Sequence, residues 1–235
     1  MANLVLFLLG TVITLYSGSG TFPESEIKKH IKDALGEDVK IEIKIQQDEN
    51  KKQNLTLLLK NWEADFFTAS ETKIFISDFK IWGLKDVKKK TLPKIQFEMR
   101  LDDSAVTDAL IYSNPGLMIN STDITSRGIE VHGMVDFGIG YPVPFTVFGD
   151  PDVDERTVLI FKPRQVSLFN FRLPHFLSAP FYGIVTQIFD LDEVDVDYYI
   201  AQVVERKVGI DFHPVIKKWK TGKGLLIITG YFDHK

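Results

Sequence analysis

Residues 39–46 alternate strictly between apolar side chains and side chains that are charged or carry an amide. The apolar positions are Val39, Ile41, Ile43 and Ile45. A period of two places the two kinds of side chain on opposite faces of a strand, and a strand with one wet face is typical of antiparallel sheet. The polar turn at 48–53 and the apolar-rich run at 54–62 then predict a hairpin over residues 38–62.

The same reasoning predicts strands along most of the chain. Further strands are expected at 73–83, 94–101, 128–140, 144–149, 157–171, 213–219 and 225–232. In the segment 128–140, one parity is apolar at Ile129, Val131, Val135, Phe137 and Ile139. These alternating patterns favour antiparallel pairing over a parallel sheet.

Helical spacing of apolar residues predicts amphipathic helices at 25–35, 103–113 and 175–189, and a further helix at 198–209. Asp102 or Asp103 provides the N-cap of the second of these helices. The expected fold class is therefore α+β, with a long curved antiparallel sheet and amphipathic helices laid against it.

The composition excludes several classes of protein. Apolar residues make up 44% and charged residues 26% of the 235 positions, which is typical of a globular domain and not of a disordered or polytopic membrane chain. No cysteine is present, so disulfides, thiolate nucleophiles and cysteine-ligated metals are excluded. A net charge of −4 argues against a dedicated nucleic-acid binder. We expect a single domain over residues 21–235.

The N-terminal segment has the length of a secretion signal. An apolar run at 4–16 precedes the small residues of 17–21, and it is too short for an ordinary membrane span, which needs about 20 residues. Residues 1–20 are therefore expected to be a signal peptide or a short N-terminal anchor, although no Lys or Arg precedes Lys28. A buried strand or helix is the alternative. The signal interpretation places the protein outside the cytoplasm, in the periplasm or cell envelope.

Motifs of common enzyme classes are missing from the sequence. The chain has no G-x-S-x-G, P-loop, G-x-G-x-x-G or H-E-x-x-H motif, and its five histidines are far apart. We expect no catalytic residue, no metal ligand and no cofactor. A hydrolase would need a histidine such as His132 or His175 to meet a carboxylate and a hydroxyl in a cleft.

Two acidic runs and two groups of lysines remain among the charged residues. The run at 150–155 starts like a calcium loop, but it has Glu155 where glycine is needed and Phe161 where a bidentate glutamate is needed. This run and the one at 190–197 are expected to be solvated turns, with calcium binding as the alternative. The lysines within 85–90 and at 217–218 are expected to be solvated, or to attract anionic lipid headgroups.

A surplus of bulky apolar residues is the feature that points to function. The chain has 18 Phe, and aromatic residues make up 12% of it. Helices laid on curved sheets enclose an apolar groove if their inner side chains do not meet, and a buried acyl chain gains about 0.8 kcal/mol per CH₂. A completely filled core is the alternative. The expected groove-lining residues are Ile27, Ile31, Val106, Leu110, Phe181, Ile184, Val185 and Ile188.

The order of motifs over residues 101–171 is similar to that of a known family. An Asp-capped helix (LDDSAVTDALI) precedes the strand motif Gly128 to Gly133, a proline-rich crossing (YPVPFTVFG) and the strand VLIFKPRQVSLFN. Leu173-Pro174 and a terminal strand with Gly224, Leu226, Ile228 and Gly230 follow. The pattern, over roughly residues 22–232, resembles the LmeA-like family of extracytoplasmic phospholipid-binding proteins, a bacterial domain of unknown function. The resemblance implies a tubular lipid-binding (TULIP-like) fold and a non-enzymatic role.

One expected function and one alternative follow. We expect a protein that binds, and as a further step transfers, phospholipid or another fatty acyl lipid in an apolar groove at the cell envelope. Its partners would be the lipid and a membrane surface, contacted peripherally, and not nucleic acid. The alternative is an envelope structural or adaptor protein with a fully packed core and a protein partner.

Overall fold

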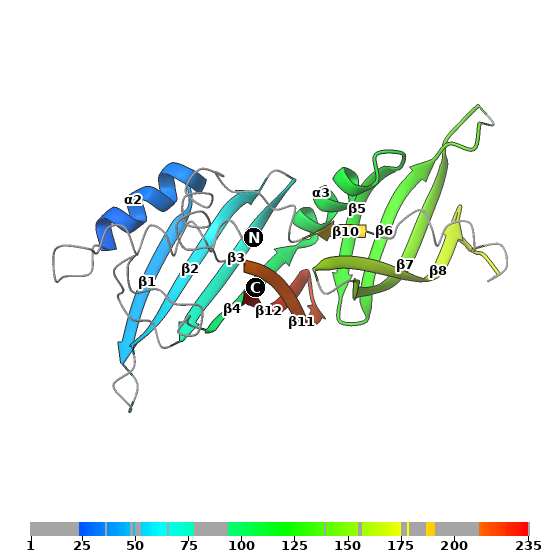
Figure 1. Cartoon of the computed structure of the whole chain (residues 1–235). Coiled ribbons are helices and arrows are strands. Elements are labelled where there is room, and N and C mark those ends of the chain that lie inside the picture. Colours follow the sequence, from blue (N-terminus) through cyan, green and yellow to red (C-terminus); the bar gives the residue numbers. More distant parts are fainter. Residues whose placement is uncertain are drawn as a thin grey trace.

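Most of the strands that the alternating residues predict are present in the structure, a computed structural model of the chain (Figure 1). The strand expected at 128–140 ends at Val135, and residues 78–83 of the strand expected at 73–83 lie outside the described residues. The structure describes residues 24–35, 37–47, 49, 53–64, 66–77, 94–138, 140–154, 157–174, 178, 187–190 and 212–234. The helices are α2 (Glu24–Leu35) and α3 (Asp103–Ser113). The strands are β1 (Lys40–Gln47), β2 (Gln53–Ala64), β3 (Phe67–Ser77), β4 (Lys94–Asp102), β5 (Met118–Thr125), β6 (Gly128–Val135), β7 (Val143–Asp154), β8 (Val158–Leu168), β9 (Phe171–Arg172), β10 (Gln187–Asp190), β11 (Phe212–Gly222) and β12 (Leu225–His234).

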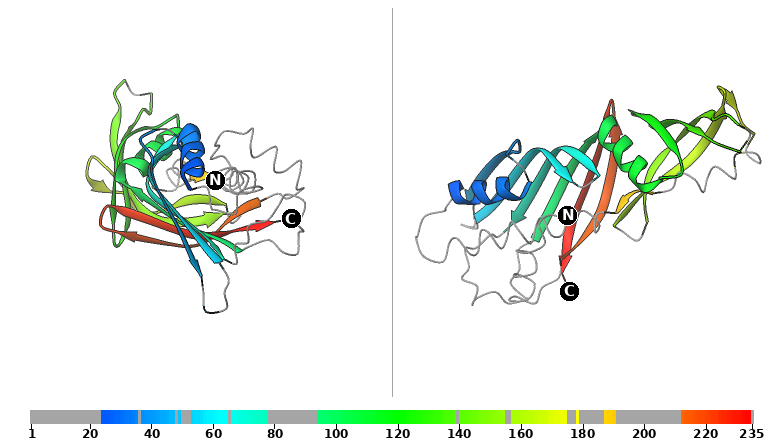
Figure 2. Two further views of the ribbon diagram at one scale, coloured as in Figure 1. Left: turned by 90° about the vertical axis from the view of Figure 1, so that its left-hand side faces the viewer. Right: turned by 90° about the horizontal axis from the view of Figure 1, so that it is seen from above.

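The strands build two antiparallel sheets. Sheet 1 has the order β1-β2-β3-β4-β12-β11, and sheet 2 has the order β10-β8-β7-β6-β5, with β9 paired to β8. The sheets follow each other along the long axis of an elongated molecule, with α3 at their junction (Figures 1 and 2). The chain leaves sheet 1 through α3, builds sheet 2, and returns with β11 and β12, so that β12 pairs with β4.

The described part of the chain is mostly β, with two short helices, where the sequence predicted α+β with more helix. The antiparallel sheets and the helices at 25–35 and 103–113 are confirmed. The helix expected at 175–189 is wrong at its end, because Gln187–Asp190 form β10 and pair with β8. Backbone pairing with a neighbouring strand outweighs helical spacing there, since Ile188 and Phe189 suit a strand equally well. The helix expected at 198–209 lies outside the described residues.

The hairpin expected over residues 38–62 is confirmed. Strands β1 and β2 pair from Lys40 with Lys60 to Gln47 with Gln53. The alternate leucines of β2 are buried, whereas the lysines of β1 are exposed. We call the side of each sheet that carries the buried residues its inner face, and the opposite side its outer face. Helix α2 lies over the inner face of sheet 1, where its Ile31 joins the core (Figure 2).

Phe rings that cover strand glycines help the sheets to curve. Gly133 lies opposite Phe145 in sheet 2, and Gly230 lies opposite Phe97 in sheet 1. A Cβ atom on Gly133 would lie 2.6 Å from Cζ of Phe145, and one on Gly230 would lie 2.5 Å from Cζ of Phe97. A glycine covered by a neighbouring ring lets a strand bend without leaving a hole in the core. Part of the phenylalanine surplus therefore serves curvature.

One apolar core runs through both sheets and the helix between them. Its buried members include Leu59 of sheet 1, Leu110 of α3 and Val147 of sheet 2. The polar side chains among the described buried residues are Thr72, Thr122 and Ser178, and none of the three is ionisable. The interior is thus a continuous apolar volume shared by the two sheets.

Replacing Gly230 by alanine tests the role of the close ring. Gly230→Ala is expected to lower the free energy of unfolding by about 1–3 kcal/mol, because the new Cβ collides with the Phe97 ring and with the carbonyl oxygen of Val215. Gly222→Ala is the control, since the nearest atom to its Cβ would be 4.0 Å away. Urea denaturation measures both variants, and equal stability of the two would contradict the prediction.

Candidate functional site

Helix α3 begins at the cap that the sequence predicts. The Asp102 carboxylate accepts a hydrogen bond from the backbone N–H of Ala105 at 2.9 Å and from the hydroxyl of Ser104 at 2.7 Å. Asp102 is also the last residue of β4, so the strand runs directly into the helix. The helix is fixed by this cap at the end of sheet 1, with a buried apolar side made of Ala105, Val106, Ala109 and Leu110.

Polar side chains of α3 bond the backbone of β5, which is an edge strand of sheet 2. The Asp103 Oδ1 atom accepts a hydrogen bond from the N–H of Ile124 at 2.6 Å, and the Thr107 hydroxyl oxygen accepts one from the N–H of Thr122 at 3.0 Å. The Thr122 hydroxyl in turn donates to the carbonyl oxygen of Asp103 at 2.7 Å. These bonds satisfy edge groups that have no neighbouring strand.

The other end of α3 bonds β10, the opposite edge strand of sheet 2. The Ser113 hydroxyl donates to the carbonyl oxygen of Ile188 at 2.9 Å, and the Asn114 side-chain amide donates to that of Gln187 at 3.3 Å. Both edges of sheet 2 therefore meet the same helix. The sheet has to curve to achieve this, and its inner face turns toward α3.

The structure places four of the eight predicted groove residues in the interior. Each of the four has an exposed fraction of 0%: Ile31, Val106, Leu110 and Ile188. Leu110 and Ile188 lie where α3 meets β10, whereas Ile31 lies on α2 over sheet 1. The side chain of Ile27 is not described. Phe181, Ile184 and Val185 lie outside the described residues.

The inner face of sheet 1 reaches the solvent along its edge strand β1. Val39 is buried, Ile41 and Ile43 pack partly buried against the core, and Ile45 is 38% exposed. Ile45 pairs with the buried Leu55 of β2, which confirms that it lies on the inner face. We call Ile41, Ile43 and Ile45 the β1 strip. Alternation identifies the face of these residues, but not their exposure, so the sequence did not reveal that the strip reaches the solvent.

A chain of aromatic rings connects sheet 1 to α3. Ring centroids are 6.0 Å apart for Trp62 and Phe67, 5.2 Å for Phe67 and Phe66, and 4.7 Å for the stacked pair of Phe66 and Tyr112. Trp62 is fully buried, and its indole N–H donates to the hydroxyl of Thr72 at 2.8 Å. Because this polar atom is paired, the rest of the ring adds apolar surface to the interior.

His132 meets both a carboxylate and a hydroxyl on the outer face of sheet 2. Its Nε2 lies 3.0 Å from Oδ2 of Asp123, and its Nδ1 lies 3.2 Å from Oγ1 of Thr146. The three residues come from the neighbouring strands β5, β6 and β7, and Asp123 is exposed. Strand β6 pairs on both sides, so its N–H groups are used in the ladder and are not oxyanion donors. The geometry fits a cross-strand polar cluster better than a hydrolase site.

The prediction of a solvated turn at 150–155 is wrong for residues 150–154, because β7 extends to Asp154, and Glu155 lies outside the described residues. Asp150 forms an ion pair with Arg164, and Asp152 forms one with Lys162, both across to β8. The hydrogen bond from Lys162 holds the pKa of the Asp152 carboxyl below its usual range. Apart from Asp190, the second acidic run lies outside the described residues. Within the described ranges, no three His, Asp or Glu side chains converge in a way that could hold a metal ion.

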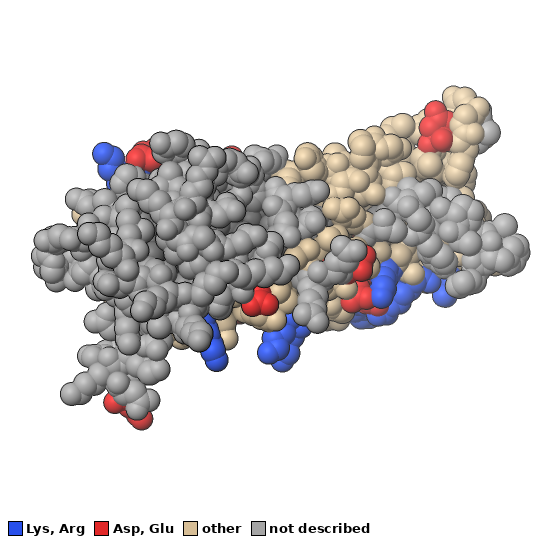
Figure 3. All heavy atoms as spheres, in the orientation of Figure 1, with Lys and Arg blue, Asp and Glu red and all other residues tan. Residues whose placement is uncertain are grey.

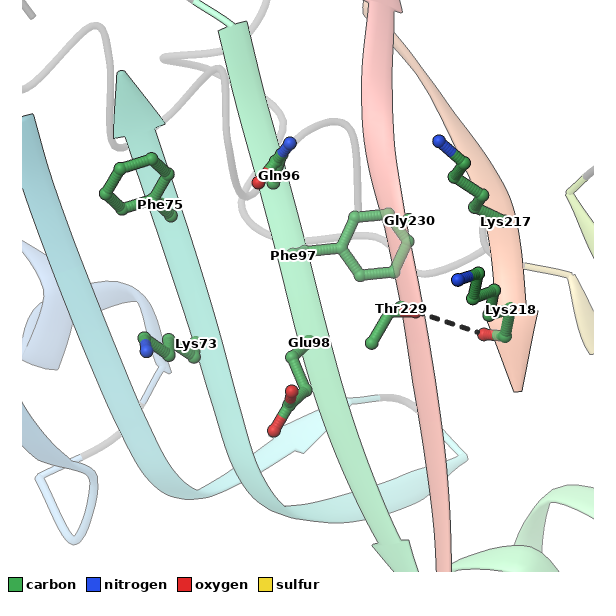
Figure 4. A pocket seen from close by; sticks show the side chains of 9 residues that line it. All are labelled: Lys73, Phe75, Gln96, Phe97, Glu98, Lys217, Lys218, Thr229 and Gly230. Atoms are coloured by element: carbon green, nitrogen blue, oxygen red, sulfur yellow. Dashed lines mark hydrogen bonds between the residues drawn. The ribbon is translucent and has the colours of Figure 1, made fainter. Parts of the chain in front are cut away.

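A hollow of about 400 Å³ lies on the outer face of sheet 1 (Figure 4). Lys73 of β3 and Lys217 and Lys218 of β11 are exposed at its rim, and no described residue forms an ion pair with them. Glu98, which also lines it, is held by Arg100 at 3.0 Å. Flexible exposed lysines attract anions with little specificity. The other lining residues are Phe75, Gln96, Phe97, Thr229 and Gly230.

Comparisons of the chain with models of protein families, with curated proteins and with solved structures found no match. Over the residues that the structure describes, no helix is long and apolar enough to cross a membrane.

Removing the Asp103 carboxylate should loosen the junction of the two sheets. Asp103→Ala is expected to lower the free energy of unfolding by about 2 kcal/mol, because the N–H of Ile124 loses a charged acceptor. Asp108→Ala changes an exposed residue of the same helix and serves as the control. Urea denaturation compares the two, and an equal effect of both substitutions would show that the bond does not stabilise the junction.

The ion pair of Asp152 predicts a pH dependence. Because the folded pKa of Asp152 is depressed, the pair stabilises the protein above the ordinary pKa of the carboxyl, and this contribution is lost as the pH falls through the depressed value. Carboxyl titration by NMR should show a higher Asp152 pKa in Lys162→Met, and no change in the control Arg164→Met. An unchanged pKa in Lys162→Met would refute this origin of the shift.

Proposed function

We propose that this protein binds a phospholipid or another acyl-chain lipid in the apolar interior between its curved sheets, without catalysis. The observation that carries the proposal is the β1 strip, which joins the solvent at Ile45 to the continuous core. An acyl chain that enters along this strip passes no charged side chain among the described inner-face residues of β1. Burial of each CH₂ contributes about 0.8 kcal/mol, so a chain of about ten carbons gains enough to bind.

The tubular arrangement of a TULIP-like fold belongs to the same proposal. It is supported by α3, whose side chains bond both edge strands of sheet 2, and by α2, whose Ile31 is buried over sheet 1. In this arrangement the β1 strip is the entry, and Ile31 of α2 would form part of the wall of the interior. The lipid headgroup remains at the solvent end of the strip, near Ile45.

The place and purpose of binding are further parts of the proposal. A carrier of the cell envelope would take lipid from a membrane surface that it contacts peripherally, and residues 1–20 would direct its export or anchor it. An interior whose described buried side chains include no ionisable group suits a carrier better than an enzyme. No cofactor enters the proposal.

One observation favours a second function. Val106, Leu110 and Ile188 are completely buried, so the protein itself fills the interior near α3. A structural or adaptor protein of the envelope, with a packed core and a protein partner, is therefore the alternative.

Lipid that copurifies with the chain distinguishes the two functions. The protein is expressed in bacteria, purified without detergent, and its organic extract is quantified by mass spectrometry. We expect close to one acyl lipid per chain, and roughly tenfold less in Ile45→Glu, because the new carboxylate would lie beside the acyl chain at the entry.

Gln46→Glu is the matched control for this experiment. It introduces the same side chain at the next residue of β1, but on the outer face. It should therefore leave the lipid content unchanged. A folded parent protein without lipid, or an equal loss in both variants, would count against the proposed site and favour the adaptor function.

A further inference from the structure

Four aromatic side chains are exposed at the end of sheet 2 that points away from sheet 1. The loop between β6 and β7 carries Phe137 and Tyr141, and the turn between β8 and β9 carries Phe169 and Phe171. The two segments lie at the same end of the molecule (Figures 1 and 2), and the N–H of Phe169 donates to the carbonyl oxygen of Pro144, next to the loop, at 3.1 Å. We call these four residues the aromatic rim.

The exposure of Phe169 and Phe171 is not required by the fold. Phe169 and Asn170 form the two-residue turn between the paired residues Leu168 and Phe171, and both have positive φ, 49° for Phe169 and 65° for Asn170. Asn and Gly favour this conformation, whereas a bulky aromatic residue rarely adopts it. Phe169 is nevertheless 52% exposed and Phe171 78% exposed. An exposed phenylalanine in a strained turn indicates a contact outside the folded chain.

The size and chemistry of the aromatic rim favour a lipid surface as the partner. Four side chains, each about half exposed or more, present roughly 400 Å² of apolar area. A stable protein interface needs about 800 Å² on each partner, so a second copy would be held weakly. Aromatic residues that project from turns suit the headgroup region of a bilayer, where their apolar rings are buried and the backbone stays hydrated.

The charges beside the aromatic rim fit a phosphate layer. Arg172 follows Phe171 directly and is exposed, and its guanidinium has no ion pair with any described residue. A guanidinium binds phosphate oxygens through two parallel hydrogen bonds. The nearby Asp136 accepts a hydrogen bond from the N–H of Gly138 at 2.7 Å, so its carboxylate is used within the loop. On the face drawn in Figure 3, the upper surface of sheet 2 is uncharged apart from an acidic group near its far end, and Lys and Arg gather along the lower edge.

We infer that the aromatic rim inserts into the headgroup region of a phospholipid bilayer and docks the protein there, with Arg172 on a lipid phosphate. The inference takes the membrane as partner from the proposed function, and it names the surface that makes the contact. Because Arg172 and Asp136 balance in charge, docking is driven by the aromatic rings. We therefore expect the protein to dock on membranes of zwitterionic phosphatidylcholine, and to remain docked at high salt.

A fluorescent label at one residue measures docking in the full chain. The sequence has no cysteine, so Tyr141→Cys and Tyr112→Cys each provide a single thiol for a polarity-sensitive dye. Tyr112 of α3 is the matched control, because both tyrosines are 59% exposed. With phosphatidylcholine vesicles in high salt, we expect a blue-shifted emission at position 141 and none at position 112. Equal responses at the two positions would overturn the inference.

Two further substitutions in the Tyr141→Cys chain test the phenylalanines. Phe169→Asn together with Phe171→Ser should weaken vesicle binding roughly tenfold. Phe169→Asn alone should not lower the urea midpoint, because asparagine suits the positive φ of the turn. Unchanged vesicle binding of the double variant would overturn the inference. A blue shift that grows with protein concentration in the absence of vesicles would also overturn it, because the rim would then contact a second copy of the chain. Copurified lipid is measured separately. A protein that carries lipid but does not dock would refute only this inference, and a protein that docks but carries no lipid would refute only the proposed function.

Discussion

The structure depends on the hydrogen bonds that join α3 to the backbone of both edge strands of sheet 2. Asp103 and Thr107 bond the backbone of β5, and Ser113 and Asn114 bond that of β10. An edge strand without such partners exposes unpaired N–H and C=O groups, which invites pairing with another chain. Since α3 also continues directly from β4, the same bonds hold the two sheets end to end. The continuous apolar interior follows from this junction, because it joins the inner faces of the two sheets through the buried side of α3.

The β1 strip and the aromatic rim lie on different sheets, which suggests that lipid entry and membrane contact occur at different places along the long axis. Sheet 1 offers the β1 strip, through which an acyl chain would reach the core. Sheet 2 offers the aromatic rim at the far end, which would hold the protein on a membrane. Glycines covered by phenylalanine rings, such as Gly230 under Phe97, give the sheets the curvature that such an interior needs. The completely buried side chains near α3 would keep an acyl chain within sheet 1, because a lipid has to displace protein contacts to go further.

Local patterns in the sequence predicted much of the fold. The alternation of residues 39–46 predicted the first hairpin, and the adjacent Asp102 and Asp103 predicted the start of α3, because both signals act over a few residues. The bond from Ile124 to Asp103 spans 21 residues and depends on how the sheets meet, so no local pattern could reveal it. The same reason explains why β10 was mistaken for helix: its pairing with β8 is a tertiary contact. The groove was predicted only as a set of apolar residues, since sequence does not distinguish the exposed Ile45 from the buried Val39.

Fluorescence of Trp62 tests most directly whether an acyl chain occupies the interior. Trp62 is fully buried in sheet 1, and the sequence has two other tryptophans, Trp82 and Trp219, which can be changed to phenylalanine. The protein is then loaded with a phospholipid brominated near the end of one acyl chain, since bromine quenches indole emission at short range. The account predicts strong quenching of Trp62 by this lipid, and weaker quenching by one brominated close to the headgroup. Bound lipid that leaves Trp62 emission unchanged would contradict the account, because the acyl chain would then lie outside the interior of sheet 1.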